Sequence, residues 1–255
     1  RLDLQSLKGK DLGRMVRESG FDVDSAQSLL SGDIELNGVS IRGTALTDDL
    51  LSTVDRTGSA LAKVNAINAS EHYTTVRADV LETLVLGDAI VGGQLDQTNS
   101  FAINGEQITN VLIQAGDASG TLVGAINSVY ETTGVLAMVD DIGALTLTAD
   151  DGRNIEIVTS SNFASSATGL NSGFADTVVT GGAIQLVSNE QIELEINTLG
   201  MDAAIGHGTG LGTNYIAFTP DTYLETVLIT SQEEARRTID ITDGALDTLR
   251  KQVSS

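Results

Sequence analysis

Two stretches of this chain resemble each other, and this internal repeat restricts the possible folds more than any other feature. The first unit begins with DIELNGVSI (Asp33 to Ile41), and the second begins with FAINGEQI (Phe101 to Ile108). An Asn-Gly pair lies between two short apolar segments in both units. This pattern predicts a β-hairpin, because a type I′ turn needs positive φ at both central residues. The predicted turn residues are Asn37, Gly38, Asn104 and Gly105.

Each predicted hairpin is followed by a helix and then by a strand. Both helices end in Ala-Ile-Asn, at Ala66 to Asn68 and at Ala125 to Asn127, and a valine-rich strand follows each at matching spacing. Repeated supersecondary units of this kind indicate a small module that is used twice. The sequence therefore predicts an α+β fold, with β-rich domains built from repeated hairpin–helix–strand units and a helical segment attached to them.

Alternation of apolar residues predicts further strands after the second unit. Residues 144–158 read as a hairpin that turns at Asp151-Gly152, and residues 183–187 and 192–196 read as another pair of strands. On this basis we divide the chain into five parts. They are a junction segment (1–32), a first module (33–98), a second module (99–158), a β-rich region with glycine-rich loops (159–219), and a return strand with a C-terminal helix (220–255).

The last 25 residues, 231–255, contain the longest predicted helix. Ser231 and Glu234 have the spacing of a capping box, in which each side chain satisfies a backbone N–H of the first turn. Apolar residues then recur at steps of four and three, which is the heptad spacing of a coiled coil. We call these positions the seam: Ala235, Ile239, Thr242, Leu246, Leu249 and Val253.

Two interpretations of the seam are open. The helix could dock on the core of its own domain, as amphipathic helices commonly do. Alternatively, it could be part of a coiled-coil-like rod. No other stretch offers a heptad helix of similar length, which favours the rod. We therefore expect the chain to be a fragment whose partner helices lie in sequence beyond it.

Charge and composition exclude several functions. The chain has 14 Lys and Arg against 35 Asp and Glu, a formal net charge of −21. A nucleic-acid-binding surface needs a basic stripe, and an anionic membrane would also be repelled. The chain has no Cys, which excludes disulfides and thiol catalysis. No apolar run approaches the roughly 20 residues of a membrane helix. We therefore expect neither nucleic acid nor membrane as a partner.

Residues with catalytic or metal-binding chemistry are few. His72 and His207 are far apart and lack the spacing of a zinc site on a helix. The Asp pairs at 140–141 and 150–151 lack the pattern of an EF-hand and are better explained as turns. The glycine-rich segment 206–212 contains no lysine that could hold a phosphate. We therefore predict no catalytic residue, no cofactor and no metal.

Two features resemble bacterial flagellins. The repeated Asn-Gly turns and Ala-Ile-Asn helix ends resemble the short Ile-Asn ("IN") motif in the variable outer region of flagellins and of some hook-associated proteins. The segment from Leu228 to Val253 resembles the start of the flagellin C-terminal rod helix, with Thr242 where isoleucine is commoner. The second resemblance is the more specific of the two.

This resemblance implies a structural subunit of the bacterial flagellar filament, which is not an enzyme. Such a subunit is secreted and self-assembles outside the cell for motility, with its outer domains exposed on the filament surface. The partners implied are other flagellin subunits, an export chaperone, hook-associated proteins and a host innate immune receptor. The alternatives are a hook–filament junction protein, a filament cap protein, and a secreted glycan-binding adhesin. An enzyme inserted into a flagellin scaffold would carry a metalloprotease signature, which the sequence lacks.

Overall fold

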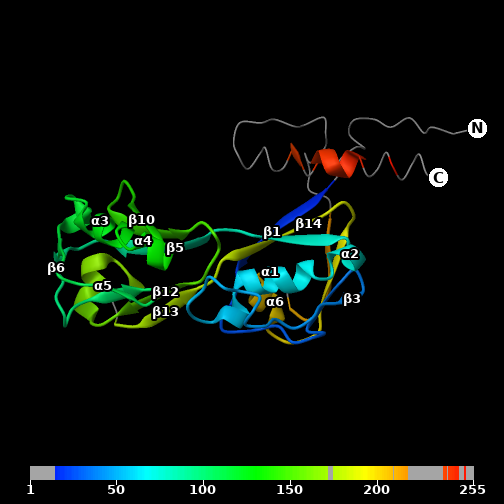
Figure 1. The fold of residues 1–255 in the computed structure, drawn as a ribbon, viewed down its shortest axis with the longest axis horizontal. Coiled ribbons are helices and arrows are strands. Elements are labelled where there is room, and N and C mark those ends of the chain that lie inside the picture. Colours follow the sequence, from blue (N-terminus) through cyan, green and yellow to red (C-terminus); the bar gives the residue numbers. More distant parts are fainter. Residues whose placement is uncertain are drawn as a thin grey trace, which may run out of the picture.

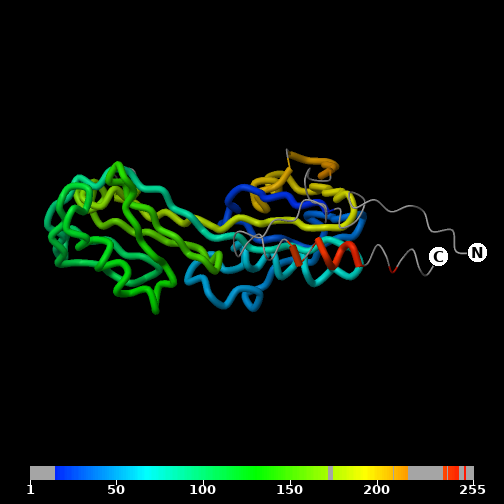
Figure 2. Tube along the Cα trace, turned by 90° about the horizontal axis from the view of Figure 1, so that it is seen from above, coloured from blue at the N-terminus to red at the C-terminus, as the bar shows by residue number. Residues whose placement is uncertain are grey.

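Two separate hydrophobic cores divide the protein into two lobes. The computed structural model describes residues 15–171, 175–208, 210–217, 238–239, 241–246 and 250. The described part mixes helices with antiparallel sheets, which confirms the predicted α+β class. Figure 1 shows the lobes end to end, and the second view in Figure 2 shows the same arrangement.

The first lobe consists of two sheets and three helices around one core. One sheet has the order β1-β14-β4, and the other has the order β16-β15-β2-β3. Its strands are β1 (Val16–Asp22), β2 (Ile34–Leu36), β3 (Val39–Ser40), β4 (Val76–Val80), β14 (Ala183–Ser188), β15 (Ile192–Ile196) and β16 (Gly212–Ile216). Its helices are α1 (Ala60–Asn68), α2 (Glu71–Thr74) and α6 (Met201–Ile205), with a 3-10 turn at Arg56–Gly58.

The second lobe has the same plan. Its sheets have the orders β10-β11-β5 and β13-β12-β7-β8, with an additional β6-β9 pair. Its strands are β5 (Thr83–Ala89), β6 (Gly93–Gln94), β7 (Phe101–Ile103), β8 (Glu106–Ile108), β9 (Leu112–Ile113), β10 (Leu136–Val139), β11 (Ala144–Ala149), β12 (Ile155–Thr159) and β13 (Thr177–Thr180). Its helices are α3 (Thr121–Asn127), α4 (Tyr130–Thr133) and α5 (Asn162–Thr168), with a 3-10 turn at Ala115–Asp117.

The second lobe is inserted into the first, between β4 and β14. The same backbone hydrogen bond joins the two ends of the β4–β14 connection in the first lobe and of the β10–β11 connection in the second. In the first lobe, Leu81 N–H donates to the Ala183 carbonyl at 2.8 Å; in the second, Asp140 N–H donates to the Ala144 carbonyl at 3.0 Å. A short turn thus joins β10 to β11, whereas the whole second lobe occupies the equivalent place between β4 and β14. The internal repeat is therefore a nested duplication of an entire lobe.

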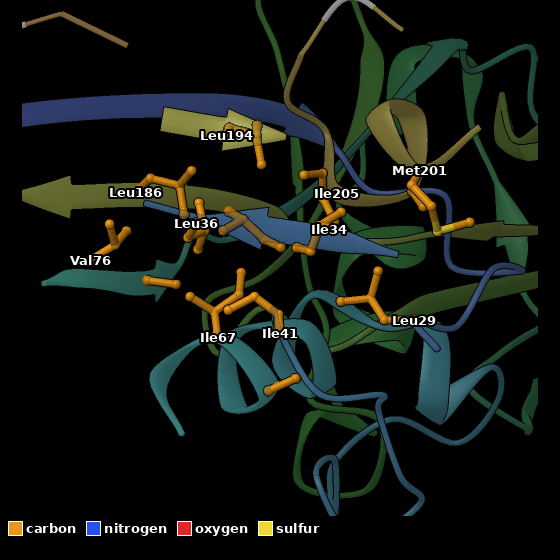
Figure 3. Close-up of a cluster of buried hydrophobic side chains, with 14 of the residues drawn as sticks. Leu29, Ile34, Leu36, Ile41, Ile67, Val76, Leu186, Leu194, Met201 and Ile205 are labelled. Carbon is orange, nitrogen blue, oxygen red and sulfur yellow. The ribbon is translucent and has the colours of Figure 1, made fainter. Parts of the chain in front are cut away.

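The core of the first lobe lies between its two sheets and helix α1. Figure 3 shows Leu36 from β2, Ile67 from α1 and Leu186 from β14 converging there. Helix α1 begins at Ser59, whose side-chain oxygen accepts a hydrogen bond from Ala62 N–H at 3.1 Å. This is the preferred N-cap arrangement. The helix then buries small residues at Ala60, Ala62 and Ala66, so its backbone can approach the sheet closely.

The lobes also contact each other through Asn154, which is fully buried. Its N–H donates to the Ser52 hydroxyl at 2.9 Å, and its side-chain amide donates to the Val54 carbonyl at 3.0 Å. Both partners precede helix α1 of the first lobe. A loop of the first lobe is therefore fixed to the strand junction before β12.

The observed lobes differ from the predicted five-part division. Modules 33–98 and 99–158 each contain the expected hairpin, helix and strand. However, region 159–219 is split, because α5 and β13 complete the second lobe whereas β14 to β16 complete the first. Strand β1, inside segment 1–32, also belongs to the first lobe, and β5 and β6 of 33–98 belong to the second. Antiparallel sheets join strands that are distant in sequence, and a linear division cannot anticipate this.

The hairpin predicted at 144–158 is also wrong, because its two strands do not pair with each other. Strands β11 and β12 occur there, but β11 pairs with β10 and β5, while β12 pairs with β7 and β13. Both strands contribute to the same core, so the chain turns a corner between two sheets at Asp151-Gly152. Strands β14 and β15 likewise belong to different sheets. Apolar alternation identifies which side of a strand faces the core, but not its neighbour.

Candidate functional site

The helical residues near the C-terminus lie against the outer side of the β1-β14-β4 sheet (Figure 1, red). Ile241 forms a small buried cluster with Met15 and Val187. Ala245, one helical turn later, is buried as well. Gly244 approaches the loop after β14 so closely that a Cβ there would lie 2.8 Å from the Asn189 side-chain oxygen. One face of this helix is thus fitted to the first lobe.

A separate, exposed face of the helix carries the seam. The side chains of Ile239 and Leu246 are 60% and 44% exposed. Thr242 is exposed between them, and its hydroxyl donates to the Thr238 carbonyl at 2.8 Å. At 3.6 residues per turn, these three positions lie on one side, away from Ile241 and Ala245. Ala235, Leu249 and Val253, and the capping residues Ser231 and Glu234, lie outside the described residues.

The two Asn-Gly turns have closely matching backbone geometry. In the first lobe, Asn37 has φ 50° and Gly38 has φ 74°; in the second, Asn104 has φ 49° and Gly105 has φ 86°. Positive φ at both central residues is the geometry of a type I′ turn. The turns connect β2 to β3 and β7 to β8. We call these asparagines the turn asparagines.

Each turn asparagine also joins three segments of its lobe. Asn104 accepts a hydrogen bond from Glu156 N–H at 2.8 Å and donates through its side-chain amide to the Thr133 carbonyl at 2.9 Å. Asn37 repeats both contacts, with Glu193 N–H at 2.8 Å and the Thr74 carbonyl at 2.7 Å. The side chain therefore links the hairpin to the adjacent strand and to the end of a helix.

A second pair of asparagines, at the ends of α1 and α3, holds each helix to the next strand. The side chain of Asn68 both accepts from and donates to the backbone of Ala78, at 2.7 and 2.9 Å. Asn127 makes the same two bonds with Ala137, at 2.7 and 3.2 Å. The Ile-Asn repetition in the sequence is therefore a repetition of hydrogen bonds that assemble each lobe.

Asn104→Asp is expected to destabilise the second lobe by about 2 to 4 kcal/mol. The substitution keeps the shape of the side chain, but it replaces the amide donor to the Thr133 carbonyl with a carboxylate oxygen at a buried position. The free energy of unfolding from urea titration measures this loss. Asn110→Asp is the matched control, because Asn110 also has positive φ (59°) but is exposed. Equal losses in the two variants would contradict the assigned role.

Sequence reasoning missed Lys63 in helix α1, the largest fully buried polar side chain among the described residues. It is 0% exposed, and its Nζ donates to the carbonyls of Asp24 and Ala204 at 2.9 and 2.6 Å. Burial lowers the pKa of Lys63 to about 7, although Asp24 acts in the opposite direction. A lone lysine within a mostly apolar helical segment, ALAKVNAI, was the available signal.

The two histidines are not brought together. His207 follows α6 in a loop, as predicted, but it is buried, with Nε2 2.8 Å from the Ile184 carbonyl. Burial lowers the pKa of His207. His72 lies in α2, edge-on to the Tyr73 ring. Within the described ranges, no group of three or more His, Asp or Glu could hold a metal ion, and none of the described helices is long and apolar enough to cross a membrane.

Comparison with known proteins gives matches among flagellins. No protein-family profile matches the chain. The chain is 37% identical to flagellin A of Helicobacter felis over 152 residues, which are 56% of this chain and 29% of that protein. It is 36% identical to flagellin A of Helicobacter pylori over 152 residues, or 56% and 28% of the two chains. Flagellin A of Helicobacter mustelae is 38% identical over 90 residues, 35% of this chain and 18% of that protein.

The chain spans less than a third of the length of these curated relatives. A crystal structure of three domains of the flagellar cap protein FliD from Escherichia coli was also found. It is 17% identical, covers 70% of this chain and 62% of that chain, and has a TM-score of 0.17, which is too low for an argument about fold. Over about half of its length, the protein is flagellin-like in sequence.

Proposed function

We propose that this chain is part of the structural subunit of a bacterial flagellar filament. The observation that carries the proposal is the two-sided helix near the C-terminus. Its Ile241 face is seated on the first lobe, while the seam residues Ile239 and Leu246 remain exposed. An exposed apolar helix face is suited to packing against further helices. The similarity to three flagellins supports the same proposal.

In this proposal, the seam packs against rod helices of the filament and the two lobes face the surrounding water. The seam includes Ala235, Leu249 and Val253 in addition to the described positions. Each fully buried leucine or isoleucine would contribute about 1.5 to 3 kcal/mol. The function is self-assembly outside the cell, without catalysis. Further partners would be an export chaperone, hook-associated proteins and a host innate immune receptor.

Growth of filaments from short, purified flagellar seeds tests the proposal. The full-length protein is mixed with seeds, and filament length is measured by negative-stain microscopy. Uniform extension is the expected result. Binding at filament ends without extension would instead identify a hook–filament junction or cap protein. If the protein does not interact with seeds but is retained on immobilised glycans, the adhesin alternative replaces the proposal.

Leu246→Asp is expected to reduce seed extension at least about tenfold, because a carboxylate in the packed seam costs more than the 1.4 kcal/mol that corresponds to a factor of ten. Both lobes should remain folded, since Leu246 is partly exposed in the structure. The rate of extension and the circular dichroism spectrum give the two readouts. Leu199→Asp is the matched control, because Leu199 is an exposed leucine of the first lobe outside the seam. Similar extension by the two variants would show that the seam is not an assembly surface.

A further inference from the structure

The β10-β11-β5 sheet of the second lobe carries large apolar side chains on its outer side. Its inner side chains, such as Leu145 and Leu147, belong to the core of the lobe. Because side chains alternate between the two faces of a strand, their neighbours along each strand point outward. We call the four outward side chains of the edge strands the apolar face: Leu84, Leu86, Leu136 and Met138, which are 39%, 75%, 36% and 64% exposed.

The strand register places the apolar face in two rows across the sheet, with a threonine of the central strand in each row. The rows are Leu136-Thr148-Leu84 and Met138-Thr146-Leu86. Neighbouring strands lie about 4.8 Å apart, so three strands form a surface about as wide as an α-helix, whose diameter is roughly 10 Å. The dimensions of the apolar face therefore suit a helix.

The nested duplication identifies the equivalent face of the first lobe. Its sheet β4-β14-β1 repeats the register of β10-β11-β5, and both edge strands have an irregularity at the same point, between Ser19 and Asp22 in β1 and between Leu86 and Ala89 in β5. From the first lobe to the second, the registers equate Arg17 with Leu84, Ser19 with Leu86, Arg77 with Leu136, and Asp79 with Met138.

In the first lobe, this outer face is largely polar and supports a helix. Arg77 forms an ion pair with Asp79 at 2.9 Å, and Arg17 donates to the Gln185 side chain. Val187, on the central strand, forms a buried cluster that includes Ile241 of the helix near the C-terminus. The duplicated architecture thus seats a helix on this side of the sheet, and in the second lobe the equivalent side is more apolar and exposed.

The apolar face is bordered by acidic residues. Exposed carboxyl-bearing residues adjoin one end of the sheet at Glu82 and Asp150, and the other end at Asp88, Asp140 and Asp141. Segment 83–180, which forms the second lobe, contains a single basic residue in its sequence, Arg153. Two copies of this surface would bring like charges together, whereas a basic partner would be attracted.

We propose that the apolar face binds a basic amphipathic α-helix of another protein. The apolar stripe of that helix covers the four side chains, and lysines or arginines beside the stripe approach the carboxylates at the ends of the sheet. Contiguous exposed apolar surface with a polar rim is typical of protein interaction sites, and removing leucine and methionine side chains from water favours binding. This proposal does not depend on the proposed assembly function.

Titration with a synthetic peptide tests the proposal. The probe has leucines at helical spacing and lysines at the other positions. The chain has three methionines, so isotope labelling of the methionine methyl groups gives few NMR signals and one of them reports on Met138. This signal should shift saturably, while that of Met201, in the core of the first lobe, should stay unchanged.

Two control peptides separate the contributions of charge and shape. One replaces the lysines with glutamates and keeps the apolar stripe. The other keeps the composition but distributes the leucines around the helix. Each should bind at least about tenfold more weakly than the probe, because the first is repelled by the rim and the second has no apolar stripe to bury.

A double variant of the chain removes the apolar face without removing negative charge. Leu86→Ser combined with Met138→Asp installs the residues of the first lobe at both positions and should weaken binding at least about tenfold, as measured by fluorescence anisotropy of the labelled probe. Leu112→Ser combined with Val91→Asp is the matched control, since these exposed residues of the second lobe lie outside the apolar face. The control should bind like the wild type.

Several results would overturn the proposal. They are the absence of a saturable shift at Met138, equal binding of either control peptide, and undiminished binding to the Leu86→Ser, Met138→Asp variant. A Met138 signal that changes with protein concentration when no peptide is present would also overturn it, because the apolar face would then join two copies of this chain.

Discussion

Gly206→Ala is expected to unfold the first lobe and to leave the second lobe folded. Gly206 ends helix α6 with φ +70°, and a Cβ there would lie 2.1 Å from the Phe21 carbonyl oxygen. Strand β1 cannot retreat easily, because Phe21 N–H donates to the Gly206 carbonyl at 2.9 Å. Left-handed backbone costs alanine about 1 to 2 kcal/mol, and the collision between two backbones adds to this. We expect a total above about 4 kcal/mol, which few single substitutions reach.

Gly169→Ala should unfold the second lobe and leave the first lobe folded. Gly169 ends helix α5 with φ +77°, and a Cβ there would lie 2.2 Å from the Asp88 carbonyl oxygen. Asp88 N–H donates to the Gly169 carbonyl at 2.7 Å, so the same contact occurs in both copies. Each glycine is required at the point where a helix end touches an edge strand.

Hydrogen exchange measured by mass spectrometry distinguishes the lobes, since each yields its own peptides. Gly38→Ala and Gly120→Ala are the controls. Both glycines have positive φ, but a Cβ added at either would meet no atom within 4 Å, so only the backbone cost of about 1 to 2 kcal/mol remains. If Gly206→Ala also loosened the second lobe, or if it behaved like Gly38→Ala, the lobes would not be separate units held by these contacts.

The stability of the first lobe is expected to rise with pH between about 7 and 10.5. The cause is Lys63, whose pKa is lowered from 10.5 to about 7 by burial. In this window, the unfolded chain binds a proton that the folded chain does not, so raising the pH favours the folded state. The lowered pKa corresponds to a gain of roughly 5 kcal/mol across the window, at 1.36 kcal/mol for each unit of pKa. Below about pH 7 the gain is absent, because both states carry the charge.

Lys63→Met isolates this contribution. Methionine has a similar unbranched shape and does not titrate, so the free energy of unfolding of the variant should depend less on pH than that of the wild type. The Asp24 and Ala204 carbonyls lose a donor, which lowers stability at every pH but does not change the slope. Urea unfolding at several pH values measures the difference. Parallel pH profiles would show that Lys63 is charged in the folded protein.

Local features of the fold could be predicted from the sequence, because short-range geometry determines them. The Asn-Gly pairs gave turns with positive φ, and the Ala-Ile-Asn segments gave helix ends at Asn68 and Asn127. Strand partners could not be predicted. Strands β4 and β14 are hydrogen-bonded neighbours although the entire second lobe separates them in sequence, and the alternation of apolar residues contains no information about such pairing.

The candidate sites, like the strand pairing, could be predicted only in part from the sequence. The heptad pattern placed Ile239, Thr242 and Leu246 on one side of a helix, but Ile241 and Ala245, which contact or face the first lobe, lie outside that heptad pattern. Lys63 was missed because it belongs to no motif. Its importance depends on helix α6, whose Ala204 carbonyl accepts from Nζ and which is distant in sequence.

The hydrogen bond between Leu81 and Ala183 has a consequence for how this protein can evolve. The chain leaves the first lobe and returns to it at adjacent points, so insertions, deletions or exchanges of the intervening sequence need not shift either strand. The core of the first lobe is built without residues from that segment. Selection can therefore diversify the second lobe while the first lobe is inherited unchanged.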